Sequence, residues 1–188
     1  MKSIVEWLMK IEGKAESIYE TLAKIFIDDK EFSKFLRQLS SEESYHKQVA
    51  LDVSECIKKM EHMPGFVIAL DDETRQRIEF PFIDIEKKIG EGRVAKEDVF
   101  GFIFTAEFSE WNDIFLYVVD SFKVCSRSFI PAIAKIQQHK RSIERFIEQD
   151  PELVAVHEKL RKLRPIWKEN LLIVDDSEAI VRLLSALL

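Results

Sequence analysis

Apolar residues recur at helical spacing along most of the first 148 residues of the chain. In residues 3–28 they fall every three or four positions, with acids and lysines between them, which predicts one amphipathic helix. The same pattern predicts three further long helices, over residues 30–60, 96–121 and 126–148. Asp28 and Asp29 separate the first two helices and can cap the second. Pro131 falls in the first turns of the last helix, where proline is tolerated.

Residues 66–95 connect the second and third long helices and have a different pattern. This segment contains a short helical piece after Asp72, a break at Pro81, a second helical piece over residues 83–89 and a stop at Gly92. Together these features indicate a long crossover. Two long helices, a crossover and two more long helices are the arrangement of ferritin-like bundles. The predicted fold class is therefore all-α: a ferritin-like four-helix bundle over residues 1–148, with a short C-terminal extension.

Composition and charge exclude several other classes of protein. Hydrophobic residues make up 46% and charged residues 33% of the 188 positions, which is typical of a globular chain and excludes intrinsic disorder. Only 5 glycines and 5 prolines argue against an all-β fold, which needs many turn residues. The net charge of −6 and the lack of a basic stripe argue against nucleic acid or an anionic membrane as a partner.

The compartment is predicted from the N-terminus and the cysteines. The opening residues carry charges where a signal peptide needs an apolar core, and no stretch has enough uncharged apolar residues to span a bilayer. Cys56 and Cys125 lie far apart and form no Cys-x-x-Cys motif. We therefore expect a cytoplasmic protein with two reduced, buried cysteines, the alternative being a redox pair.

Glu43 and His46 are the strongest pair of candidate metal ligands. Their spacing of three residues puts a carboxylate and an imidazole on one face of the second long helix, where both can bind one cation. Dinuclear carboxylate sites in four-helix bundles use one Glu from each of two helices and a Glu-x-x-His pair from each of the other two. The other helices supply the further candidates Glu12, Glu110 and His139, with Glu107 as a substitute ligand one turn from Glu110.

One ligand of that arrangement is missing. Ile136 stands three residues before His139, where the second Glu-x-x-His pair would place its bridging carboxylate. Acids occupy 34 of 188 positions, so an acid three residues before a histidine is common by chance. A bundle whose metal site has decayed into buried polar pairs is therefore the main alternative.

The first 148 residues resemble the rubrerythrin branch of the ferritin-like superfamily. The first helix of that family carries Glu-x-x-Ala-x-x-x-Tyr, matched by Glu12, Ala15 and Tyr19, and the second carries Glu-x-x-His, matched by Glu43 and His46. The third and fourth helices match in part, through Glu110, Tyr117 and His139; Asp113 and Ile136 depart from the pattern.

The resemblance implies a cofactor and an activity. Members of this family are mostly di-iron proteins that act on peroxide or dioxygen, commonly as dimers. It therefore implies iron as the cofactor, in a di-iron or a single-iron site, and a homodimer. This chain has no rubredoxin-like Cys-x-x-Cys module to deliver electrons.

The C-terminal residues resemble a different family. Residues 170–188 are similar to the first strand and helix of a two-component receiver domain, with Asp175 and Asp176 as the acidic pair that helps to hold Mg²⁺. The receiver's phospho-accepting aspartate would lie beyond Leu188, so Mg²⁺ chemistry requires a complete receiver domain. We expect the sequence to be an N-terminal piece of a longer protein or a shortened gene product, with residues 149–169 as a linker helix.

Three functions are consistent with these features. The first is a metal-binding sensory or regulatory input domain linked to two-component signalling, with a histidine kinase as partner only in a full-length protein. The second is a di-iron peroxidase or oxidase. The third is a metal-free bundle used as a dimerisation scaffold.

Overall fold

The computed structural model describes residues 2–61, 70–108, 110–123 and 125–148, and this part of the chain forms helices without strands. The helices are α1 (Lys2–Ile25), α2 (Lys30–Lys59), α3 (Asp72–Gly90), α4 (Lys96–Glu107), α5 (Glu110–Ser121) and α6 (Phe129–Glu148). The all-α prediction is confirmed for these residues. The predicted linker helix and the receiver-like segment, with Asp175 and Asp176, lie outside them.

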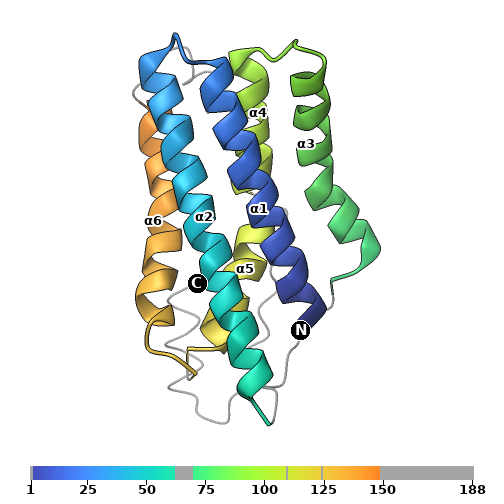
Figure 1. The fold of residues 1–188 in the computed structure, drawn as a ribbon, viewed down its shortest axis with the longest axis vertical. Coiled ribbons are helices and arrows are strands. Elements are labelled where there is room, and N and C mark those ends of the chain that lie inside the picture. The colour runs from blue at the N-terminus through green and yellow to red at the C-terminus, as the bar shows by residue number, and fades with distance from the viewer. Residues whose placement is uncertain (1, 62–69, 109, 124, 149–188) are drawn as a thin grey trace, which may run out of the picture.

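The helices run side by side along the long axis of the molecule (Figure 1). The chain passes up α1, down α2, up α3, down α4 and α5 and up α6. α1 and α2 form an antiparallel pair, α6 packs against α2 and α5, and α3 packs against α1 and α4. Because α3 carries the chain back to the top, α2 and the α4–α5 pair run in the same direction.

Apolar stripes on the helices form one continuous core. Leu8, Ile11 and Leu22 of α1 are fully buried, as are Phe32, Leu36, Leu39 and Val53 of α2. Phe35 of α2 stacks on Phe146 of α6 with ring centroids 3.8 Å apart, which joins two helices distant in sequence. Among the described residues, no helix combines the length and the hydropathy that a bilayer-spanning segment needs.

Polar residues mark the helix ends. The Asp29 carboxylate caps α2, as predicted, by accepting a hydrogen bond of 3.1 Å from the Phe32 backbone N–H. Asp71 caps α3 in the same way, accepting from the Thr74 N–H at 2.7 Å. Gly92 follows α3 with a φ of 64°, a conformation that glycine adopts without strain and that turns the chain toward α4.

The crossover holds one helix, whereas the sequence predicted two pieces broken at Pro81. Pro81 lies inside α3, and the helix continues past it to Gly90. Proline removes one backbone hydrogen bond and disfavours a helix interior. Here the apolar face of the helix compensates, because Ile78, Phe82 and Ile85 are buried against the core on both sides of the proline.

The predicted helix over residues 96–121 is interrupted after Glu107. α4 ends at Glu107 and α5 begins at Glu110. The Asn112 side-chain amide donates a 2.6 Å hydrogen bond to the Glu107 backbone carbonyl, which gives this carbonyl a partner at the end of α4. The interruption therefore falls directly beside one of the candidate ligands.

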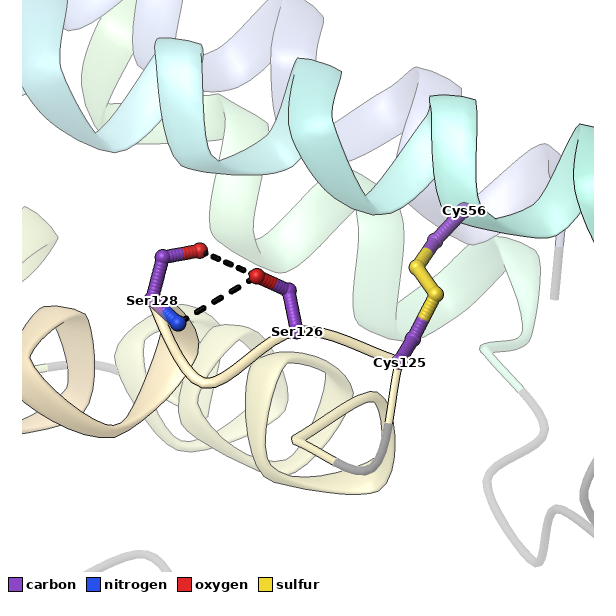
Figure 2. Close-up of a disulfide and its surroundings, with 4 residues drawn as sticks. All are labelled: Cys56, Cys125, Ser126 and Ser128. Carbon is purple, nitrogen blue, oxygen red and sulfur yellow. Dashed lines mark hydrogen bonds between the residues drawn. A yellow bond between two sulfur atoms is a disulfide. The ribbon is translucent and has the colours of Figure 1, made fainter.

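Cys56 and Cys125 form a disulfide (Figure 2). This differs from the predicted pair of reduced, buried thiols: Cys56 is buried in the last turns of α2, but Cys125 is exposed in the loop between α5 and α6. The two cysteines are 69 residues apart in sequence, and folding brings their Cα atoms to 6.4 Å. Spacing along the chain cannot show this approach, because it depends on how α2 packs beside the α5–α6 loop.

Opening the disulfide is expected to destabilise the fold. In the loop-entropy treatment, closing a loop of this length stabilises the folded chain by about 4 kcal/mol. Urea unfolding with and without dithiothreitol measures the difference. The exposed substitution Cys125→Ser should reproduce the effect of reduction, and dithiothreitol should not change the stability of this variant. A wild-type midpoint that reduction leaves unchanged would contradict the prediction.

Candidate metal centre

Among the described residues, five carboxylate and imidazole side chains lie together inside the apolar core. They are Glu12, Glu43, His46, Glu107 and His139, each at most 2% exposed. Burying a charged or strongly polar group costs several kcal/mol unless partners inside the protein replace its water. The cluster therefore needs a specific compensation.

Each residue reaches the cluster from a fixed place on a helix. Glu12 lies near the middle of α1, and Glu43 and His46 lie one turn apart near the middle of α2. Glu107 is the last residue of α4, and His139 lies in the middle of α6. Ligands held on helices keep their relative positions with little cost in loop ordering.

The first half of the cluster is the inner group, made of Glu12, Glu43 and His46. One potential ligand atom from each of the three lies within 4.8 Å of the others. His46 Nδ1 is 3.2 Å from Glu43 Oε2 and 3.5 Å from Glu12 Oε2. The spacing allows one cation to contact all three side chains.

The second half is the outer group, made of Glu43, Glu107 and His139, and it meets the same distance limit. His139 Nε2 is 3.2 Å from Glu43 Oε1 and 3.0 Å from Glu107 Oε2. Glu43 therefore belongs to both groups, and its two oxygens face different histidines. A carboxylate in this position can bridge two cations.

Two buried oxygens in the cluster are placed to bind a cation. Glu12 Oε2 and Glu43 Oε1 accept no hydrogen bond from any described residue, although both are shielded from water. An unsatisfied buried carboxylate oxygen is costly, and a bound cation is one of the few groups that can satisfy it. Carboxylate oxygens together with imidazole nitrogens suit divalent iron, manganese, cobalt and zinc. The residues present therefore fit a metal centre.

Two hydrogen bonds hold the outer group in place. His139 Nδ1 contacts Glu42 Oε2 at 2.5 Å, which fixes the imidazole ring with Nε2 toward the cluster. The Tyr19 hydroxyl donates a 2.5 Å hydrogen bond to Glu107 Oε1 and leaves Oε2 on the His139 side. Carboxylate–histidine partners of this kind orient metal ligands.

The inner group is held and enclosed by aromatic residues. The Trp111 indole N–H donates a 3.0 Å hydrogen bond to Glu12 Oε1. Phe115 packs against His46 with ring centroids 5.8 Å apart, and Phe82 packs against Trp111 at 5.4 Å. All three aromatic residues are buried, so the inner group lies behind an apolar layer.

The proximity of the carboxylates shifts the pKa values in the metal-free cluster. Burial, followed by the nearby charges of Glu107 and Glu12, raises the pKa of Glu43 well above its usual range. Burial lowers the pKa of His139, but the charges of Glu107 and Glu43 outweigh it and raise that pKa to about 10. Burial raises the pKa of Glu107, and the His139 charge outweighs it and lowers that pKa. Without metal, the outer group is stabilised by a charged histidine.

The structure brings together most of the residues predicted from the sequence. Glu12, Glu43, His46 and His139 meet as expected from the helix pattern, and Glu107, the predicted substitute ligand, joins them. The predicted ligand Glu110 is the first residue of α5, and its side chain lies outside the described residues.

Ile136, the departure from the expected pattern, is buried one turn before His139. Glu42 and Trp111 were not predicted. Glu42 stands next to Glu43, and the sequence does not show which of these two acids contacts His139. Trp111 stands four residues after Glu107, a helical spacing that is a signal for proximity to the cluster.

Comparison of the chain with known proteins found no matching family model, no matching curated protein and no matching solved structure. The metal-binding interpretation therefore stands on the geometry of the cluster and on its chemistry.

The raised pKa of His139 predicts how the metal-free protein responds to pH. A histidine whose pKa rises on folding contributes stability that is complete below its unfolded pKa of about 6.5 and is lost as pH rises through about 10. An NMR pH titration of chelator-treated protein, with the His139 resonance assigned by His139→Gln, measures the pKa of His139 directly. A midpoint near 6.5 would show that the histidine is not paired with the carboxylates.

Proposed function

We propose that this chain is a ferritin-like protein with a dinuclear metal centre, and that it serves as an iron-binding sensory or regulatory module. The inner group would hold one ion and the outer group the other, with Glu43 between them. Iron bound there would supply redox chemistry with dioxygen or peroxide. The chain's own residues orient the ligands, exclude water on the inner side and hold protons at Tyr19 and His139.

The position of Glu43 carries the proposal. Its Oε2 lies 3.2 Å from His46, and its Oε1 lies 3.2 Å from His139, so one carboxylate presents an oxygen to each half of the cluster. A decayed site that had become a set of buried polar pairs should satisfy its polar atoms internally. Glu43 Oε1 and Glu12 Oε2 instead accept no hydrogen bond among the described residues, and each has only an ionic contact with a histidine, at 3.2 Å to His139 and 3.5 Å to His46.

Charge also favours two ions over one. Glu12, Glu43 and Glu107 bring three negative charges when ionised, and Glu42 brings a fourth through its hydrogen bond to His139. Two divalent cations with neutral imidazoles balance these four charges. A single divalent cation would leave one of the three buried carboxylates uncompensated, with the half-buried Glu42 as a further negative charge at the edge of the core, which is unfavourable at low dielectric.

The helix arrangement supports the ferritin-like assignment. α1, α2, the α4–α5 pair and α6 each contribute to the cluster, and a long crossover containing α3 makes α2 parallel to α4–α5. Bundles with a long crossover and with inward-facing Glu and Glu-x-x-His ligands are the setting of dinuclear carboxylate centres.

A regulatory role is supported by where the ligands sit in the chain. His139 lies on α6, which ends at Glu148, directly before the segment predicted to link the bundle to receiver-like sequence. A change of ligand distances on oxidation would act on α6 through His139 and on the α4–α5 junction through Glu107.

A second candidate function is a di-iron peroxidase or oxidase. The Tyr19 hydroxyl favours it, because a buried O–H 2.5 Å from a ligand carboxylate places a proton beside the centre. Peroxide consumption by the iron-loaded protein, with ascorbate as reductant, separates the two candidates. Many turnovers per chain indicate an enzyme, whereas oxidation that stops after a single turnover indicates a sensor.

Metal binding tests the proposed centre. After anaerobic reconstitution with Fe(II), we expect about two ions per wild-type chain, about one in His46→Ala and in His139→Ala, and a loss of both in Glu43→Ala, because Glu43 contacts both positions. Mass spectrometry of the metal content after desalting measures this. Glu42→Gln should keep both ions but weaken the outer one by about tenfold or more.

Glu55→Ala is the matched control for the Glu43 variant. Glu55 lies on α2 as well, is exposed and pairs only locally with Lys58 among the described residues. The control variant should bind as much iron per chain as the wild type. A chain that binds no iron, or a Glu43 variant that binds as much as the control, would refute the dinuclear centre and leave the metal-free scaffold.

A further inference from the structure

The two halves of the metal cluster differ in their access to solvent. The inner group lies behind Trp111, Phe115 and other buried aromatic residues. The outer group borders a cavity of about 310 Å³ between α5 and α6, which His139 and Ile136 help to line. Other lining residues, among them Asp113, Lys140 and Arg141, are exposed, so the cavity opens to solvent.

The cavity reaches the outer group through two side chains. His139 lines it and contacts Glu107 Oε2 through Nε2 at 3.0 Å. Asn112 also lines it, and its amide lies 3.4 Å from the same Glu107 oxygen. A molecule inside the cavity would therefore lie next to His139, the residue of the outer group that lines it, and one side chain away from Glu107.

Ile136 stands where a further ligand would fit. It precedes His139 by three residues on α6, the same spacing that puts Glu43 beside His46 on α2. A carboxylate at position 136 would share an ion with His139, but isoleucine offers no ligand atom. Its side chain instead gives the cavity an apolar wall together with Leu116.

From these observations we propose that a small monocarboxylate from solution binds in the α5–α6 cavity and completes the coordination of the outer ion at the place that Ile136 leaves without a ligand. This inference rests on the proposed dinuclear centre. It gives the module a ligand class, short carboxylic acids, to which its metal centre would respond.

The lining of the cavity fits such a ligand. Ile136 and Leu116 suit a short alkyl chain. Lys140 and Arg141 bring two positive charges, which Asp113 and Glu144 balance, so the lining leaves no spare positive charge for a second carboxylate on the ligand. The volume exceeds the roughly 30 Å³ that one water occupies in the liquid about tenfold, which leaves room for several non-hydrogen atoms.

Cobalt-loaded protein provides the test. Co(II) serves as the probe metal because its visible absorption changes with coordination. Adding sodium acetate at constant ionic strength should change the spectrum of the wild type saturably. Ile136→Glu should retain two cobalt ions and lose the acetate response, since its own carboxylate takes the place of acetate. Ile130→Glu, an exposed substitution on the same helix, should behave like the wild type.

Leu116→Phe is a second variant that keeps the proposal testable if Ile136→Glu does not fold. This substitution narrows the cavity without changing a metal-binding residue. Butyrate should therefore bind about tenfold more weakly than to the wild type, whereas the affinity for acetate should change less. Two bound cobalt ions without an acetate response, or an equal response in wild type and Ile136→Glu, would refute the cavity proposal alone. Failure to bind cobalt would refute the dinuclear centre and the cavity proposal together.

Discussion

The burial of three glutamates in one apolar core is the constraint on which the rest of this structure depends. Glu12, Glu43 and Glu107 come from three helices, and none of them has access to water. Charges of one sign at such short range destabilise a fold unless cations balance them. In the metal-free chain, His139 supplies part of that balance, with its pKa raised to about 10 by Glu107 and Glu43. The raised pKa of Glu43 allows a proton to balance this carboxylate in the metal-free chain, and a bound cation would take the place of that proton.

The surrounding helices can be understood from this constraint. The pairing of α1 with α2 brings Glu12 to Glu43 and His46, and α6 brings His139 to the opposite oxygen of Glu43. The interruption between α4 and α5 places Glu107 at a helix end, where the Asn112 amide also holds its backbone carbonyl. Hydrogen bonds from outside the two groups then fix which ligand atoms point inward.

Much of the fold and most of the centre were predictable from the sequence. Helical spacing of apolar residues indicated the long helices, and the three-residue spacing of Glu43 and His46 placed both on one face of α2. The spacing could not show that the helix is interrupted after Glu107, where the Asn112 side chain binds the last carbonyl of α4. It also could not show that α3 continues through Pro81, because burial of the residues on both sides of the proline stabilises this helix. The Cys56–Cys125 disulfide and the Glu42–His139 contact join residues far apart in sequence, so only packing reveals them.

In the proposed centre, the inner and outer groups would bind their ions in different ways. The enclosed inner group is suited to hold an ion firmly, whereas the outer group borders an open cavity and is suited to exchange. A centre with one fixed and one exchangeable position can report on its surroundings through the exchangeable side. In the proposed regulatory role, His139 would pass such a change to α6.

The most direct test of the central claim is anomalous diffraction from crystals of the protein grown with Mn(II). We predict two peaks inside the bundle, about 3.5–4 Å apart. One peak should lie beside Glu12 and His46 and the other beside Glu107 and His139, and Glu43 should contact both ions. A map without peaks in the core, or with manganese only at surface carboxylates, would contradict it.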